Sequence, residues 1–259
     1  MDLRGWDYTG RNISYDLHLQ IFNIVNSLSD KDFVGVLSWG KELQTKLLAP
    51  VGISSTGVLR TVKKICDNFG FFNKQGFKPD TIPNKENILT PLGKKLFYVI
   101  DCEKKIKESN TLSEIEKNKA FEQIKILYEE IYCEALTQYK IENNDGSFFY
   151  PLQITVKALR KYKSLDKWEW YLLNTCIKHN NCVEEEEYFD KMLIKYRNGE
   201  LNFSMNNVVG KEKGHQYLPQ YFNYAGLAIV DVKPKWIIKN SLSHTDIKDK
   251  LLEKGDCHE

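Results

Sequence analysis

Residues 54–72, with the sequence SSTGVLRTVKKICDNFGFF, are the stretch that most directly indicates the fold. Apolar residues recur at helical spacing from position 58 to position 69, while Arg60, Lys63 and Lys64 occupy the other face. The Ser-Ser-Thr run before them supplies hydroxyl groups suited to a helix N-terminus. Gly70 ends the helical pattern, and two phenylalanines then begin an apolar segment. The stretch therefore predicts an amphipathic helix over 56–69 that leads directly into a strand.

The segments on either side of this helix complete an ordered series of elements. In chain order, the sequence predicts helices over 15–28, 30–37 and 56–69, a strand over 70–72, a polar and basic loop over 74–85, and a strand that closes at 87–89 into a further helix. Helix, helix, helix, strand, wing, strand, helix is the order of the winged-helix variant of the helix-turn-helix. We therefore expect a winged-helix module over residues 1–100.

The rest of the chain predicts a helical linker and a second module. Residues 101–146 are rich in charged residues and contain a long stretch with helical spacing of apolar residues. The Asn-Asn-Asp-Gly-Ser turn at 143–147 marks the end of this segment. Over 147–259, the sequence predicts helices that start at Pro151, near Asp166 and at Glu184, a segment over 216–224, and two apolar strands over 226–232 and 235–238. The expected fold class is mainly α (α+β), with tandem winged-helix modules joined by a long helical linker.

The composition is that of a globular chain in a reducing compartment. Hydrophobic residues make up 42% and charged residues 28% of the 259 residues. The net charge of +2 neither identifies nor excludes a nucleic-acid partner, because phosphate binding depends on local clustering of Lys and Arg. The N-terminus lacks the apolar core of a signal peptide, and six cysteines in so long a chain are no disulfide framework. We expect a cytoplasmic protein with no membrane partner.

The helix over 56–69 and the loop after it contain the first set of candidate DNA contacts. A helix N-terminus offers free N–H groups to a phosphate, and an arginine can donate two hydrogen bonds to one guanine. The alternative is an ordinary solvated helix face. The candidates are Ser54, Ser55, Thr56, Arg60, Lys63 and Lys64 on the helix, with Lys74 and Lys78 in the wing.

Two further segments are candidate DNA contacts. Arg4, Trp6 and Arg11 form a basic and aromatic arm that could follow a minor groove, unless Trp6 belongs to the protein core. A glycine-bounded loop after residue 207 carries polar side chains that could read adenine edges, or it is an ordinary loop. Its candidates are Lys211, Lys213, His215 and Gln216.

Three pairs of short motifs resemble the DNA-recognition region of type IIS restriction endonucleases of the FokI and AlwI kind. They are Arg4-Gly5-Trp6 with Arg11-Asn12, the stretches 55–60 (STGVLR) and 89–94 (LTPLGK), and the stretches 151–154 (PLQI) and 167–173 (KWEWYLL). The resemblance implies a string of winged-helix subdomains that bind double-stranded DNA. It also implies that cleavage belongs to a separate PD-(D/E)xK nuclease domain, which uses Mg²⁺.

A PD-(D/E)xK centre requires an acidic residue near a D/E-x-K triplet, so that two carboxylates share Mg²⁺. The best triplet is Asp231-Val232-Lys233 at the end of an apolar stretch, but the sequence provides no partner acid at a matching position. The Cys176 to Cys182 segment offers three ligand types at a spacing unlike common zinc motifs, so we expect no metal there.

The sequence thus predicts a DNA-recognition module or subunit with no cofactor of its own, whose partners are DNA and a nuclease that uses Mg²⁺. Two alternatives remain open. One is a complete PD-(D/E)xK enzyme with Asp231 and Lys233 at the metal site. The other is a winged-helix transcription regulator, because a fold does not fix a function.

Overall fold

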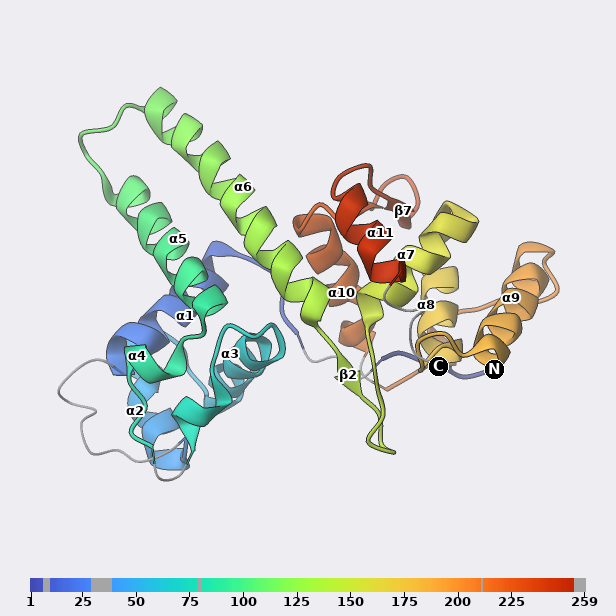
Figure 1. Cartoon of the computed structure of the whole chain (residues 1–259), viewed down its shortest axis with the longest axis horizontal. Coiled ribbons are helices and arrows are strands. Elements are labelled where there is room, and N and C mark those ends of the chain that lie inside the picture. Colours follow the sequence, from blue (N-terminus) through green and yellow to red (C-terminus); the bar gives the residue numbers. More distant parts are fainter. Residues whose placement is uncertain (7–9, 29–38, 79–80, 211, 254–259) are drawn as a thin grey trace. The chain divides into compact units, whose positions relative to one another are not determined.

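The computed structural model describes residues 1–6, 10–28, 39–78, 81–210 and 212–253, which are mainly helical with small sheets (Figure 1). The chain divides into two compact units. We call Arg11–Ala135 the helical unit, and Met1–Gly10 together with Leu136–Glu259 the sheet unit. The mainly α, α+β class expected from the sequence is confirmed. Among the described residues, no helix combines the length and the apolar character needed to cross a membrane.

The helical unit begins with three helices that share apolar faces. In chain order its elements are α1 (Tyr15–Leu28), α2 (Lys41–Val51), α3 (Thr56–Asn68), the 3₁₀ turn η2 (Lys74–Phe77), α4 (Lys85–Ile88), α5 (Pro91–Glu108) and α6 (Glu114–Gln138, up to Ala135 in this unit). The bounds of α1 and α3 confirm two predicted helices. The helix expected over 30–37 lies outside the described residues. Helix α2 was not predicted, although its buried Leu43, Leu47 and Val51 recur at helical spacing.

The expected wing is held by one β-bridge, between Phe72 and Leu89. Two backbone hydrogen bonds flank it, from the Asn73 amide to the Ile88 carbonyl at 2.7 Å and from the Thr90 amide to the Phe71 carbonyl at 3.2 Å. The second strand expected up to 87–89 is wrong in part, because residues 85–88 form α4. The Asn84 side chain caps this short helix and so favours a helical turn over an extended chain.

A buried polar network joins α1, α5 and α6 within the helical unit. His18 is 2% exposed, stacks on the Tyr128 ring at 4.2 Å and lies 3.1 Å from the Tyr132 hydroxyl. The Tyr128 hydroxyl donates to Glu103 at 2.7 Å, and Lys107 lies 2.9 Å from the same carboxylate. The helices expected as a linker over 101–146 therefore contribute, up to Ala135, to the core of this unit.

Over its described residues, the sheet unit combines the helices α7 to α11 with a three-stranded sheet and two shorter strand pairs. In chain order its elements are β1 (Leu3–Arg4), β2 (Ile141–Glu142), β3 (Phe148–Phe149), α7 (Pro151–Tyr162), β4 (Ser164–Asp166), α8 (Lys167–Cys176), α9 (Val183–Arg197), η3 (Met205–Asn207), β5 (Val208–Val209), α10 (Glu212–Tyr224), β6 (Ala228–Asp231), β7 (Ile237–Asn240) and α11 (Thr245–Glu253), together with the end of α6.

The main sheet of this unit is antiparallel, with the strand order β4-β7-β6. The predicted strands over 226–232 and 235–238 are its β6–β7 hairpin, and the predicted helix from Glu184 is α9. Trp170, Phe222 and Ile238 are buried in the core, from α8, α10 and β7 respectively. Strand β1 pairs in parallel with β5, about two hundred positions later in the chain, a pairing that no local pattern predicts.

Candidate nucleic-acid interface

Helix α3 presents a polar outer face above a buried apolar one. Leu59, Val62, Ile65 and Cys66 are buried, whereas Arg60 and Lys64 are exposed. These two cations lie four positions apart and so share one face of the helix. Arg60 is held over the first turn, since its Nε donates to the Thr56 carbonyl at 3.3 Å.

The N-terminus of α3 is capped and open to solvent. The Ser55 hydroxyl accepts a hydrogen bond from the Val58 amide at 3.4 Å. Ser54 and Ser55 are exposed and Thr56 is half-buried. Amide groups at the start of a helix, hydroxyl donors and the positive end of the helix dipole all favour an anion. The structure therefore brings Ser54, Ser55, Thr56, Arg60 and Lys64 together on one surface.

Lys63 does not share this surface. Its ammonium lies 2.6 Å from the Asp67 carboxylate and 4.4 Å from the centre of the Phe77 ring, and its side chain is only 13% exposed. The Trp39 ring completes the contact, with its centre 5.6 Å from the same nitrogen. An ammonium between a carboxylate and aromatic rings stabilises the packing of η2 against α3. Lys63 is therefore a packing residue.

The basic residues expected in the wing are exposed. Lys74 lies in η2 and Lys78 follows it, and neither side chain is buried. Their segment is held against α4, where Gly76 passes so close to the Asn87 carbonyl that a β-carbon would lie 2.5 Å from its oxygen. Lys74 and Lys78 thus stand on a fixed turn that follows α3 along the chain.

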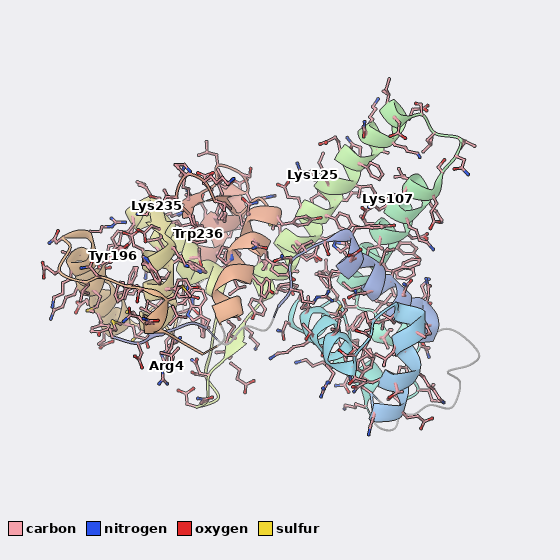
Figure 2. All side chains as sticks on the ribbon, turned by 180° about the vertical axis from the view of Figure 1, so that it is seen from behind. Arg4, Lys107, Lys125, Tyr196, Lys235 and Trp236 are labelled. Carbon is pink, nitrogen blue, oxygen red and sulfur yellow. The ribbon has the colours of Figure 1, made fainter. Side chains whose placement is uncertain are left out.

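The expected N-terminal arm is divided between the two units. Arg4 is exposed on β1 of the sheet unit (Figure 2), and Arg11 donates to the Gln20 side chain at 2.5 Å in the helical unit. Trp6 is 4% exposed, and its indole nitrogen donates to the Ile177 carbonyl at 2.7 Å. Of the two roles considered for Trp6, the structure therefore gives it the one in the core.

The other candidate loop is only partly described. Lys211 lies outside the described residues. Lys213, His215 and Gln216 lie on α10, and their side chains also fall outside the described part of the chain. The later part of α10 packs inward through Leu218, Tyr221 and Phe222.

Asp231 and Lys233 lie at the end of the β6–β7 hairpin. The Asp231 carboxylate accepts a hydrogen bond from Lys239 at 2.5 Å, and Lys233 is exposed. Across the sheet from Asp231 lies Asp166. Ile237 of the middle strand β7 separates them, because it pairs with Asp166 on β4 and with Asp231 on β6. Two strand spacings, about 10 Å, separate β6 from β4, which is too far for both carboxylates to share one ion.

Asp166 is also fully engaged elsewhere. It caps α8 through the Trp168 and Glu169 amides, and it accepts from the Tyr196 hydroxyl at 3.0 Å and the Lys235 ammonium at 2.8 Å. Burial raises the pKa of Asp166, but these hydrogen bonds outweigh it and lower that pKa overall. The cap was visible in the sequence, whereas the contacts with Tyr196 and Lys235 join distant segments and were missed.

No metal centre is formed by the described residues. Among them, no three His, Cys, Asp or Glu side chains are grouped in a way that could hold an ion. Cys176 is buried, which raises the pKa of its thiol to about 12, and Cys182 precedes α9 as its N-cap.

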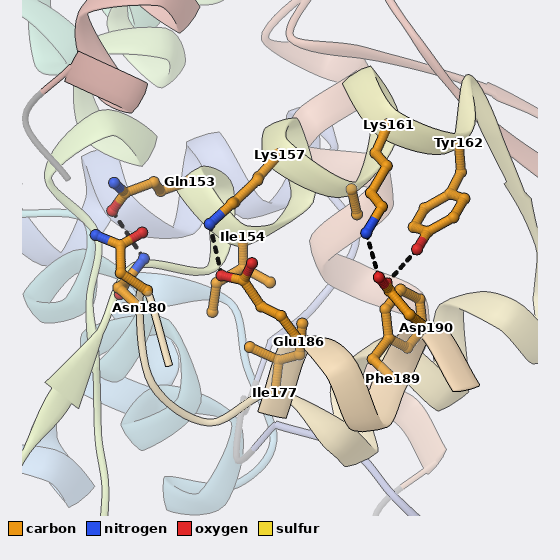
Figure 3. Close-up of a pocket in the computed structure, with 12 residues that line it drawn as sticks. Gln153, Ile154, Lys157, Lys161, Tyr162, Ile177, Asn180, Glu186, Phe189 and Asp190 are labelled. Carbon is orange, nitrogen blue, oxygen red and sulfur yellow. Dashed lines mark hydrogen bonds and ion pairs between the residues drawn. The ribbon is translucent and has the colours of Figure 1, made fainter. Parts of the chain in front are cut away.

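A pocket between α7 and α9 was not predicted (Figure 3). Ile154, Ile177 and Phe189 supply apolar side chains to its lining. Its polar residues bond to one another: Lys157 to Glu186 at 2.6 Å, Asn180 to Gln153 at 2.7 Å, and both Lys161 and Tyr162 to Asp190. The pairs of Glu186 and Asp190 hold α9 against α7, and the Asn180 pair holds the loop before α9 against α7, so these polar groups stabilise the packing of the unit.

The surface formed by Ser54, Ser55, Thr56, Arg60 and Lys64 is therefore the strongest candidate interface, and we call it the α3 surface. It joins donors and cations in the way that a polyanion requires. No protein-family model matches the chain, and a search of curated proteins finds no relative.

Proposed function

We propose that the chain is a sequence-specific double-stranded DNA recognition module or subunit of a type IIS-like restriction endonuclease, with cleavage supplied by a nuclease domain outside this chain. The α3 surface carries the proposal. Its hydroxyl donors lie at the N-terminus of a helix of 13 residues whose opposite face is buried, and Arg60 and Lys64 follow along the exposed face of that helix. Such a helix enters a major groove with its N-terminal residues at the base edges.

The arrangement of elements supports two winged-helix modules. In the helical unit, α1, α2 and α3 precede the Phe72–Leu89 bridge and the turn that carries Lys74 and Lys78. In the sheet unit, α7, β4 and α8 are followed after α9 by α10 and the β6–β7 hairpin. Helices followed by an antiparallel hairpin are the order of a winged-helix module, and the sheet unit has this order with one helix more than the usual three before its hairpin. We assign α3 and α10 as the recognition helices and residues 232–236 as the second wing.

The restriction part of the proposal rests on the motif resemblance. Asp231 pairs with Lys239, and the acid across the sheet, Asp166, lies two strand spacings away, so the chain's best D-x-K triplet gives no support for a nuclease centre. We therefore assign Mg²⁺ and cleavage to a nuclease domain or subunit that acts with this chain.

Selection from a random duplex library at moderate salt tests the proposal. We expect the purified chain to enrich one asymmetric sequence. Arg60→Ala should weaken binding to that sequence by about tenfold or more and relax the preference at one base pair, as loss of a bidentate guanine contact does. The matched control, Lys125→Ala on α6, changes an exposed cation away from the α3 surface and should leave binding unchanged (Figure 2). Enrichment of no sequence contradicts the proposal.

The same material separates the alternatives. Plasmid incubated with the chain and Mg²⁺ should stay intact. Cleavage that Asp231→Ala abolishes would instead establish a complete nuclease. A regulator would enrich a palindrome, because dimeric helix-turn-helix proteins bind two symmetric half-sites.

A further inference from the structure

The outward face of α9 carries opposite charges at its two ends, with apolar side chains among them. Glu184 and Glu187 lie toward its N-terminus, and Lys191 and Lys195 lie toward its C-terminus. Tyr188 and Ile194 fall on the same face and are 48% and 57% exposed. These positions recur every three or four residues, so they form one stripe on the helix. We call these six residues the α9 stripe.

The other charged residues of α9 are used inside the sheet unit. Glu185 accepts from the Lys178 and His179 amides, Glu186 pairs with Lys157, and Arg197 donates to Glu169 at 2.7 Å. By contrast, no ion pair within the described part of the chain involves Glu187, Lys191 or Lys195. The charged residues of α9 thus fall into two groups: those that pair within the sheet unit and hold the helix in place, and those on the stripe that make no such pair with the described residues.

The helix dipole accounts for only part of this pattern. It favours acids in the first turn and bases in the last. It does not favour Tyr188 and Ile194 on a solvent-facing stripe, where two large apolar side chains remain in contact with water. The acids also make DNA an unsuitable occupant, because they would face phosphates.

We propose that the α9 stripe is a self-association surface whose occupant is a second copy of this chain, bound antiparallel. In that orientation Glu184 and Glu187 of one copy face Lys195 and Lys191 of the other, and a twofold axis repeats both contacts. Tyr188 then lies close to the twofold axis, about one helical turn along from Ile194 of the other copy. A parallel pairing would set acid against acid and base against base.

The size of the surface sets the strength of the dimer. A helix of 15 residues is about 22 Å long. Its one-sided contact is smaller than the roughly 1,200 Å² of a stable interface, so the dimer is weak and depends on concentration. Salt weakens it further, because exposed charge pairs are screened.

Sedimentation velocity of the full chain without DNA tests the proposal, whatever the chain binds. We expect a monomer–dimer equilibrium that shifts toward monomer in high salt. The Lys191→Glu/Lys195→Glu variant and the Glu184→Lys/Glu187→Lys variant should each weaken dimerisation by about tenfold or more, because each sets like charges together. An equimolar mixture of the two should dimerise again, since every contact is then between opposite charges.

Lys119→Glu/Lys125→Glu on α6 is the matched control, because it applies the same charge change to exposed residues outside the stripe. It should dimerise like the unaltered chain. Circular dichroism of each variant establishes that it is folded, and recovery in the mixture gives a second check. A chain that stays monomeric up to millimolar concentration, or variants that dimerise normally, would overturn the proposal.

Discussion

Gly93 approaches the carbonyl of Phe71 so closely that a β-carbon on the glycine would lie 1.9 Å from the carbonyl oxygen. The contact sets the first turn of α5 directly against the segment that follows α3. Thr90 reinforces it, because its hydroxyl donates to the Gly70 carbonyl at 2.6 Å and accepts from the Gly93 amide at 2.9 Å. The segment that directly follows α3, one of the two recognition helices that we propose, is thus fixed to the start of α5.

Gly93→Ala should destabilise the protein by about 3 kcal/mol, because the neighbouring atom is a backbone oxygen that cannot turn aside. Urea denaturation measures the change. Gly57→Ala is the matched control, since its β-carbon would lie 3.8 Å from the Ser55 hydroxyl and α3 has ordinary helical geometry there. That control should be neutral or stabilise by up to about 1 kcal/mol. Equal stability of the two variants would contradict the close approach.

The Glu103 carboxyl makes the free energy of unfolding depend on pH in the acidic range. Burial raises the pKa of its carboxyl, but the contacts with His18, Lys107 and Tyr128 outweigh burial and lower that pKa to about 2. The folded state therefore binds this proton more weakly than the unfolded state does. The contribution of the Glu103 carboxylate to the free energy of unfolding is fully present above pH 4.5 and is lost as the pH falls toward 2. We expect a loss of roughly 2–3 kcal/mol over this range.

Urea denaturation of Glu103→Gln tests whether Glu103 causes the loss of stability in acid. The variant should have lower stability at pH 7 and a shallower dependence on pH below 4.5, because the amide does not titrate. Glu122→Gln, at an exposed position of α6, should follow the unaltered protein at every pH. An unchanged slope in Glu103→Gln would assign the acid sensitivity to other carboxyl groups.

Lys63 and Lys64 are neighbours in the sequence and should respond differently to alanine. Lys63→Ala should lower the free energy of unfolding by about 1 kcal/mol, because it removes contacts with Asp67 and the Phe77 ring. Lys64→Ala should leave stability unchanged, weaken DNA binding and reduce the slope of log K against log salt by about 1. Denaturation and titrations at several salt concentrations measure both. A salt slope that changes only in Lys63→Ala would refute the assignment.

Trp6→Ala should destabilise the sheet unit by roughly 3–5 kcal/mol, since the ring lies 5.5 Å from both Phe149 and Trp170, centre to centre. Trp6→Phe retains most of the apolar burial but leaves the Ile177 carbonyl without its donor, so it should cost about 1–3 kcal/mol. Thermal unfolding measures both. A stability change below about 0.5 kcal/mol in Trp6→Ala would contradict the core position of Trp6 and favour an exposed N-terminal arm.

The sequence by itself determined the elements whose signals are local. Periodic apolar residues predicted α1 and α3, the helix predicted from Glu184 is α9, and capping residues located the starts of α3 and α8 at Ser55 and Asp166. Apolar runs on either side of Lys233-Pro234 predicted the β6–β7 hairpin. Each signal depends on residues a few positions apart, because helix periodicity, caps and tight turns are set by near neighbours.

Only the tertiary structure decided which of the polar residues face outward. Lys63 and Lys64 have the same charge in the sequence, and the ion pair with Asp67 together with the packing of Phe77 and Trp39 separates Lys63 from Lys64. Trp6 meets Ile177, and Asp166 meets both Tyr196 and Lys235, across long stretches of chain. Burial and ion pairing depend on such distant contacts, which the order of residues specifies only through the complete fold.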